Sequence, residues 1–262
     1  MRIHFTIPDR RPDWFTDVVR CATARSGLPV FVSEGVPERL KALENAILAA
    51  RRDTEGGPGM RRFMALGILR WPVLLDAVKD LPALEWPVCC LDWDILVCSD
   101  LRLWLAKFSD FDYCMTSDKS GNPSAPYLIR DIRPLRAFCS ALESAVENQS
   151  PSLAWASDMF LWSAVALAHG WKVGDMVKPL DGQTFDNNIG ESAGRFVMET
   201  GKRSVFENGA DVVKEGERKK LQLENGKAYL FEESGARVEA VALHLWDGHK
   251  AEIPEFVKGL GL

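Results

Sequence analysis

Apolar and polar residues follow one another along the first two thirds of the chain with two different spacings. Short segments that are apolar or alternating and end at turn residues are typical of strands; they are 2–7, 28–33, 86–91 and 127–129. Segments that repeat apolar residues every three or four positions are typical of helices; they are 13–24, 37–52, 61–79, 134–147 and 155–169. Pro72 is expected to kink or divide the third of these helices.

The order of the segments predicts the fold class. Residues 86–91 form the most apolar strand, so we expect them at the centre of a sheet that is covered on both faces. Alternating strands and helices favour an α/β fold with a mainly parallel central sheet flanked by helices. In the last third, Asn225-Gly226 and Ser234-Gly235 separate alternating segments, which predicts an antiparallel β-rich section. No linker marks a boundary, so a single domain over 1–262 is expected.

Composition and charge narrow the class of protein. The chain is 47% hydrophobic and 26% charged, which is ordinary for a soluble globular protein, and its net charge of -5 argues against nucleic acid as a partner. The best candidate for a membrane-spanning segment, 63–75, is interrupted by Arg70, so no transmembrane segment is expected; contact with a membrane surface stays open. Six cysteines without zinc-type spacing predict reduced thiols and a cytoplasmic location.

Two carboxylates stand directly after the most apolar strand, in Asp92-Trp93-Asp94. A chain of this length gives about one Asp-x-Asp by chance, and a second copy, Asp110-Phe111-Asp112, lies in a polar setting and is expected to be ordinary. Ligands of open α/β sheets bind outside the carboxyl ends of the strands, which is where the first pair is expected. The context, more than the tripeptide, marks the first pair as a candidate site.

The spacing of the first pair suits a cation. Residues two apart on an extended chain face the same way, so both carboxylates can converge on one ion. Hard oxygen ligands favour Mg²⁺ or Mn²⁺, and these metals usually bridge phosphate oxygens. The competing interpretation is a strand end whose acids are solvated.

At this point the sequence resembles a family. "RRFMALGILRWPVLLDAVKDLPALEWPVCCLDWDILVCSDL" is similar to the central region of GT-A-fold, metal-dependent nucleotide-sugar glycosyltransferases, and the pattern loosely resembles glycosyltransferase family 8. "SGNPSAPYLIRDIRPLRAF", "ASDMFLWSAVA", "FDNNI" and "HLWDGHK" follow in the order of the family's later motifs. The chain departs from family 8 in two ways: its last motif reads His-x-x-x-Gly-x-Lys, and the usual Pro-Trp after that motif is absent. The resemblance implies a GT-A-like, Rossmann-like fold and transfer of a sugar from a nucleotide diphosphate sugar, with a UDP-sugar as the expected donor, to a glycan or other acceptor.

The resemblance also implies roles for individual residues. His244 is expected to complete a Mn²⁺ (or Mg²⁺) site with Asp92 and Asp94, because imidazole beside carboxylates fits Mn²⁺ better than Mg²⁺. His249 is the competing ligand. We expect His244 to stand at a cleft and to pack against little. Asp158, at the start of a helix, is implied to act at the transferred sugar, whereas its ordinary role would be that of an N-cap.

The remaining implied contacts concern donor and acceptor. The residues implied to contact the donor nucleotide, its phosphates or the metal are Thr6, Ile7, Arg62, Asp92, Trp93 and Lys250. The sugar and acceptor are implied to involve Ser124, Ala125, Asp186 and Asn187.

Two other functions stay open. A phosphatase of the haloacid-dehalogenase type also places Asp-x-Asp after an apolar strand, and Lys172, Asp175 and Asp181 imitate its later acidic motif. However, Leu96 stands where that class has Thr or Val, and some ninety residues precede the motif. The second alternative is a protein that binds a nucleotide sugar or a glycan on the same fold without catalysis.

Overall fold

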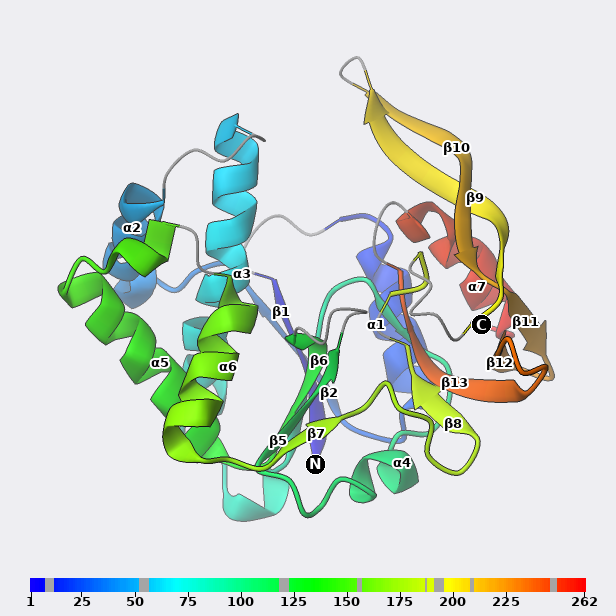
Figure 1. Cartoon of the computed structure of the whole chain (residues 1–262), viewed down its shortest axis with the longest axis horizontal. Helices are drawn as coiled ribbons and strands as arrows, with labels where there is room; N and C mark the ends of the chain where they lie inside the picture. The colour runs from blue at the N-terminus through cyan, green and yellow to red at the C-terminus, as the bar shows by residue number, and fades with distance from the viewer. Residues whose placement is uncertain are drawn as a thin grey trace.

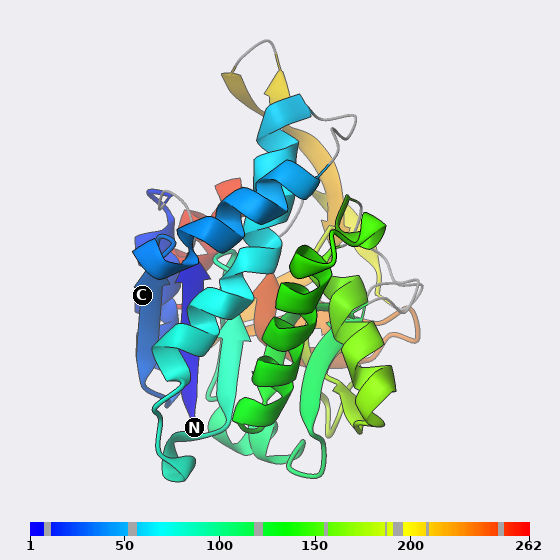
Figure 2. The ribbon, with the colours of Figure 1, turned by 90° about the vertical axis from the view of Figure 1, so that its left-hand side faces the viewer.

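A computed structural model of the chain describes residues 1–7, 12–51, 57–117, 123–154, 157–186, 188–190, 196–207, 210–245 and 249–262. Its elements form three layers, and the middle layer is a central sheet (Figure 1). Helices cover one face of this sheet, and a second sheet with two further helices lies on the other (Figures 1 and 2).

The central sheet has six strands. In spatial order they are β2 (Val30–Glu34), β1 (Arg2–Ile7), β3 (Val88–Leu91), β6 (Pro123–Ile129), β5 (Tyr113–Ser117) and β7 (Val173–Asp175). The pairs β2–β1, β1–β3 and β5–β7 are parallel, whereas β6 runs antiparallel to both β3 and β5. All four residues of β3 are buried, as expected for a central strand. The predicted α/β class is therefore confirmed, and the sheet is mixed because β6 is reversed.

The helices are α1 (Phe15–Arg25), α2 (Lys41–Ala50), α3 (Gly57–Val78), α4 (Arg102–Ala106), α5 (Ile132–Glu147), α6 (Asp158–His169) and α7 (Ile253–Gly259). The predicted helices appear in the expected order as α1, α2, α3, α5 and α6, whereas α4 and α7 were not predicted. Short 3₁₀ turns add η1 (Glu38–Leu40), η2 (Ala83–Glu85), η3 (Pro151–Ala154) and η4 (His249–Glu252). Pro72 lies inside α3 without dividing it. Among the described residues, no helix combines the length and the apolar character that crossing a membrane requires.

The predicted antiparallel section forms most of the second sheet. Its strands are β11 (Leu221–Glu224), β12 (Lys227–Phe231), β13 (Arg237–His244) and β4 (Ile95–Val97), with β8 (Gln183–Phe185) also paired to β13. Asn225 and Gly226 join β11 to β12 with φ of 52° and 73°, as a tight hairpin turn with two left-handed residues requires.

A separate hairpin consists of β9 (Met198–Glu207) and β10 (Ala210–Lys219), paired over their full length. It rises from the body of the protein on the side toward which β1 points, and the N-terminal end of α3 rises on the same side (Figures 1 and 2). The carboxyl ends of the parallel strands therefore lie at the base of these two projections.

An aromatic cluster fills the space between the central sheet and helices α3, α5 and α6. The Trp71 and Trp162 rings lie 5.1 Å apart between centroids, Trp71 lies 4.8 Å from Tyr127, and Trp162 lies 4.8 Å from Phe138. Each of these side chains is fully or almost fully buried, so the cluster is a large part of the apolar surface that stabilises the fold.

All six cysteines are buried and none forms a disulfide. Burial raises the pKa of the Cys21, Cys90 and Cys114 thiols to about 12, although nearby arginines partly oppose this for each of them. The thiols are therefore protonated parts of the core at neutral pH, in agreement with the prediction of reduced cysteines.

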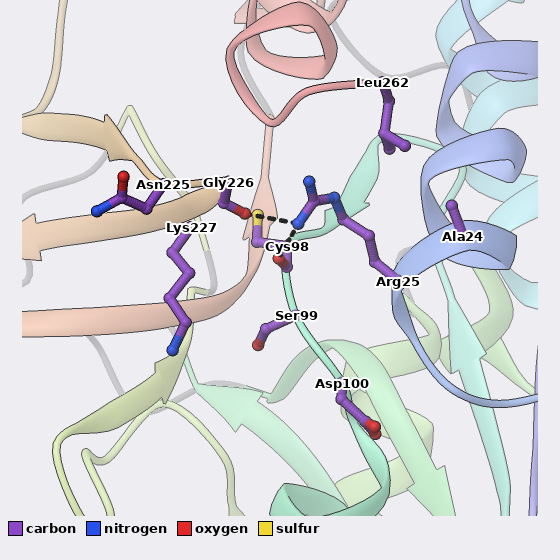
Figure 3. Close-up of a pocket in the computed structure, with 9 residues that line it drawn as sticks. All are labelled: Ala24, Arg25, Cys98, Ser99, Asp100, Asn225, Gly226, Lys227 and Leu262. Atoms are coloured by element: carbon purple, nitrogen blue, oxygen red, sulfur yellow. Dashed lines mark hydrogen bonds between the residues drawn. The ribbon is translucent and has the colours of Figure 1, made fainter.

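Arg25 ties helix α1 to the second sheet and to the C-terminus. Its Nη1 donates to the carbonyl oxygens of Gly226, at 2.5 Å, and Cys98, at 3.3 Å (Figure 3). Its Nη2 donates to the carbonyl oxygen of Leu260. These contacts border a pocket of about 450 Å³ that Ser99, Asn225 and other residues line. The pocket adjoins the segment after β4, at the opposite end of that strand from Asp94.

The first prediction compares two turn glycines with positive φ. Gly226→Ala should lower the free energy of unfolding by about 2 kcal/mol, and Gly235→Ala by about 1 kcal/mol, because both residues are left-handed. A Cβ at Gly226 would also lie 3.2 Å from Arg25 Nη2 and 3.4 Å from the Leu260 oxygen, whereas nothing lies within 4 Å at Gly235. Urea unfolding measures both costs, and equal costs would contradict a structural role for the Arg25 contacts.

Candidate metal centre

The Asp-x-Asp segment lies where the chain passes from one sheet to the other. Strand β3 of the central sheet ends at Leu91, and β4 of the second sheet begins at Ile95. Ile95 pairs with His244, the last residue of β13, and the Leu245 amide donates to the Asp94 carbonyl oxygen at 3.0 Å. This antiparallel pairing brings His244 beside two carboxylates that precede it by about 150 positions in the sequence.

The three side chains converge as metal ligands do. His244 Nε2 lies 3.2 Å from Asp94 Oδ1 and 4.0 Å from Asp92 Oδ2. One ligand atom from each residue lies within 4.8 Å of the others. Two atoms at about 2.1 Å from an octahedral ion are about 3.0 Å apart when adjacent and about 4.2 Å apart when opposite. The group therefore fits one divalent cation after small shifts, and two carboxylates with one imidazole suit Mn²⁺.

A cation from the chain holds the second oxygen of each carboxylate. Arg70 Nη1 donates to Asp92 Oδ1, and Lys250 Nζ lies 2.9 Å from Asp94 Oδ2. The oxygens that remain are those that face His244. Arg70 and Lys250 thus orient the two carboxylates and leave one oxygen of each for a shared ligand.

Burial and these charges shift the pKa values in opposite directions. Burial raises the pKa of Asp92, and the neighbouring Asp94 adds to the shift, although Arg70 opposes it. Burial also acts to raise the pKa of Asp94, but the combined attraction of His244 and Lys250 outweighs it and holds that pKa well below its usual range. Burial acts to lower the pKa of His244, yet the nearby carboxylates of Asp94 and Asp92 raise it overall.

Arg70 also joins the centre to Asp158. Arg70 Nη2 donates to Asp158 Oδ2 at 2.5 Å, and Trp71 Nε1 donates to the same oxygen at 3.0 Å. Ser157 is the N-cap of α6, so Asp158 does not have the capping role considered from the sequence; its carboxylate instead faces α3. The Arg70 guanidinium lies over the Trp71 ring, 4.7 Å from its centroid, and only 13% of its side chain is exposed.

Sequence reasoning missed the role of Arg70. It treated this residue only as an interruption of an apolar segment. The available signal was a single arginine among Ile68, Leu69, Trp71 and Val73, all of which are buried. A cation in such a helix needs buried carboxylate partners, and Asp92 and Asp158 are these partners.

The residues expected around the nucleotide lie at the predicted strand ends. Phe5 pairs with Leu91, so Thr6 lies level with the start of the Asp-x-Asp segment. The Ile7 side chain is fully buried, and its carbonyl oxygen accepts from the Gly35 amide, so Ile7 has no side chain to offer a ligand. Trp93 is partly buried; it contacts Trp14 edge-on and lies 5.8 Å from Lys250 Nζ.

Other expected contacts do not gather at the centre. Arg62 is exposed and precedes Arg70 by eight positions on α3, about 12 Å along the helix axis. Ser124 and Ala125 lie in β6, and their side chains are outside the part that the structure describes. Asn187 is also outside the described residues.

Asp186 and His249 differ from their expected roles. Asp186 is fully buried, with its Oδ1 2.5 Å from Lys219 Nζ, so its carboxylate is turned away from any acceptor. His249 is also buried, and its two ring nitrogens face Glu252 Oε1 and the Glu217 carbonyl oxygen. His249 is therefore part of a structural contact, and the described metal-ligand group contains His244 in its place. His244 itself is fully buried, which corrects the expectation that it packs against little.

The second Asp-x-Asp copy has the ordinary character expected of it. Asp110 is exposed in a turn, and Asp112 Oδ2 accepts from the Lys172 amide at 2.9 Å. Neither belongs to the group of possible ligands found among the described residues.

Comparison with known proteins adds no family. No family model matches the chain, and no curated protein matches it significantly.

The second prediction tests the centre directly. Asp94→Asn keeps the shape of the side chain but removes the charge that a divalent cation needs, so Mn²⁺ affinity should fall at least tenfold. Asp110→Asn is the matched control and should leave the affinity unchanged. Titration with Mn²⁺, followed by the electron paramagnetic resonance signal of the free ion, measures both variants. Wild-type affinity in a folded Asp94→Asn protein would exclude this metal site.

The third prediction concerns Arg70. Arg70→Met leaves Asp92 and Asp158 buried without their shared cation, so the free energy of unfolding should fall by about 3–5 kcal/mol. Adding Asp158→Asn removes one of these charges and should recover part of the loss. Urea unfolding of the single and double variants gives the comparison. A purely additive loss would show that Arg70 and Asp158 are not coupled.

Proposed function

We propose that the chain is a glycosyltransferase that uses Mn²⁺ or Mg²⁺ to transfer a sugar from a nucleotide diphosphate sugar, such as a UDP-sugar, to a glycan or another acceptor. The observation that supports this most is the convergence of Asp92, Asp94 and His244 beyond the carboxyl end of β3. Open α/β sheets bind ligands at this end of their strands, and the motif order of the sequence resembles GT-A enzymes.

The chemistry of transfer suits the charges at this centre. The bond between the anomeric carbon and the diphosphate breaks, and its electron pair leaves with the diphosphate. An acceptor hydroxyl oxygen forms the new bond to the anomeric carbon, and its proton is released to solvent. A bound divalent cation supplies a Lewis acid for the phosphate charge that develops. Lys250, which is 31% exposed at Asp94, adds a second positive charge beside the leaving group.

Asp158 and Arg70 suit the sugar side of the reaction. The Asp158 carboxylate is fixed by Arg70 and Trp71 and retains slight exposure. A fixed negative charge stabilises the positive charge that develops at an anomeric carbon. Arg70 pairs with both Asp158 and Asp92, so one guanidinium orients the carboxylate proposed to face the sugar and a carboxylate proposed to bind the metal.

The phosphatase alternative has less support from the positions of its residues. Asp175 Oδ2 accepts from Ser117 Oγ at 2.7 Å on β7, at the edge of the central sheet. Asp181 is 75% exposed and pairs with Lys107. Neither carboxylate joins Asp92 and Asp94 in the described ligand group, as the later acidic motif of that class would require.

The fourth prediction tests the proposed function. The chain should slowly release UDP from a UDP-hexose, and this release should depend on Mn²⁺. His244→Ala should lower the rate at least tenfold, because the imidazole that completes the site is lost. His169→Ala, at the exposed end of α6, is the matched control and should keep the wild-type rate. Thermal unfolding confirms that both variants are folded at the assay temperature.

The same assay distinguishes the alternatives. Cleavage of phosphomonoesters without release of UDP would support the phosphatase, and UDP-sugar binding without turnover would support the binding protein. Release of UDP at equal rates with Mn²⁺ and with a chelator would contradict the metal-dependent mechanism.

A further inference from the structure

A second buried ion pair joins the hairpin to the segment after β8. Lys219, the last residue of β10, and Asp186 are each fully buried, and Nζ lies 2.5 Å from Oδ1. Lys219 Nζ also lies over the Phe196 ring, 5.2 Å from its centroid. A fully buried ion pair carries a large desolvation cost and often stabilises a fold no better than apolar residues of similar size. Stability alone therefore does not explain why this pair is buried here, and its contacts with the strand of His244 suggest another role.

Backbone hydrogen bonds connect this pair to His244. The Lys219 amide donates to the Ile189 carbonyl oxygen at 2.7 Å, and the Ile189 amide donates to the His244 carbonyl oxygen at 2.9 Å. The Asp186 amide donates to the Ala242 carbonyl oxygen at 3.0 Å, two residues before His244. Both members of the ion pair are thus connected by backbone hydrogen bonds to β13, the strand that carries His244.

The same end of the hairpin also holds the turn that carries Lys250. The Glu217 carbonyl oxygen lies 3.2 Å from His249 Nε2, and Arg218 Nε lies 3.2 Å from Glu252 Oε2. His249 and Glu252 begin and end η4, and Lys250 lies between them. We call Glu217, Arg218 and Lys219 the hairpin root. Three successive residues of this root therefore contact segments that supply His244 and Lys250.

We propose that Lys219, paired with Asp186, is a positioning residue that fixes the hairpin root against β13 and so holds His244 in the geometry that binds the metal. The proposal rests on the metal site of the proposed function. It extends that site to a hairpin that neither the Asp-x-Asp motif nor the ligand group includes. The hairpin root and the metal centre are then structurally coupled, so a substitution in the root changes the affinity for the ion.

The test removes both charges of the pair so that neither is left buried alone. The double variant Asp186→Asn/Lys219→Met should fold, as circular dichroism and urea unfolding report, because both replacements are close in shape. Its dissociation constant for Mn²⁺, measured without donor, should rise at least fivefold, since residues that orient metal ligands typically change affinity by about 10–100-fold. Lys220→Met, at the exposed neighbour of Lys219, is the matched control and should bind Mn²⁺ as the wild type does.

A second measurement does not need the metal. The chain has four histidines, so the imidazole ¹⁵N signals can be assigned with His244→Ala. In the metal-free double variant the His244 signals should shift, and those of His4 and His169 should not. If the double variant does not fold, the isosteric Asp186→Asn protein is judged by the same measurements.

The outcomes separate this proposal from the proposed function. If the wild type binds no Mn²⁺, the metal-dependent function fails, and the His244 signals alone decide the positioning role. If the wild type binds Mn²⁺ and the folded double variant binds it with less than a fivefold loss, the positioning role is overturned while the metal site stands.

Discussion

The pairing of β4 with β13 is the constraint on which the candidate site depends. Asp92 and Asp94 are placed by β3, but their two carboxylates lie beside the His244 imidazole only because β13 ends opposite Ile95. A shift of this register by one residue would turn His244 to the other face of its sheet. The geometry of the centre is therefore a property of the junction between two sheets, and neither sheet supplies it alone.

The charges around this junction nearly compensate one another. The carboxylates of Asp92, Asp94, Asp158 and Asp186 face the permanent cations Arg70, Lys219 and Lys250. Burial of such groups is tolerated only when they are paired. One negative charge remains, and a proton on His244 or Asp92, or a bound cation, offsets it. The raised pKa of His244, which its carboxylate neighbours maintain against burial, expresses the same imbalance.

Much of the fold follows from local patterns, because apolar spacing is set by neighbours a few residues away. Strand β1 has the predicted bounds Arg2–Ile7, and β3 and the antiparallel section appear where the sequence placed them. The reversal of β6 was not predicted, since the direction of a strand depends on how the whole chain connects.

The candidate site was predictable where an apolar strand and a motif coincide, as at Asp92 and Asp94. It was not predictable where a charged residue is buried only because its ion-pair partner lies far away in the sequence. Lys219 lies among alternating charged residues of a hairpin, and nothing local distinguishes it from exposed Lys220. Asp186 was assigned to an acceptor loop for the same reason, because its burial depends on that lysine.

Two indole rings at the centre give it an optical property of its own. Trp71 donates its Nε1 hydrogen to the carboxylate of Asp158, and Trp93 stands between the two carboxylates of the Asp-x-Asp segment with Lys250 near its face. Indole emission responds to the charges and hydrogen bonds around the ring. An ion or an anionic ligand that rearranges these groups therefore alters the intrinsic fluorescence of the protein, so occupancy of the centre can be followed without any label.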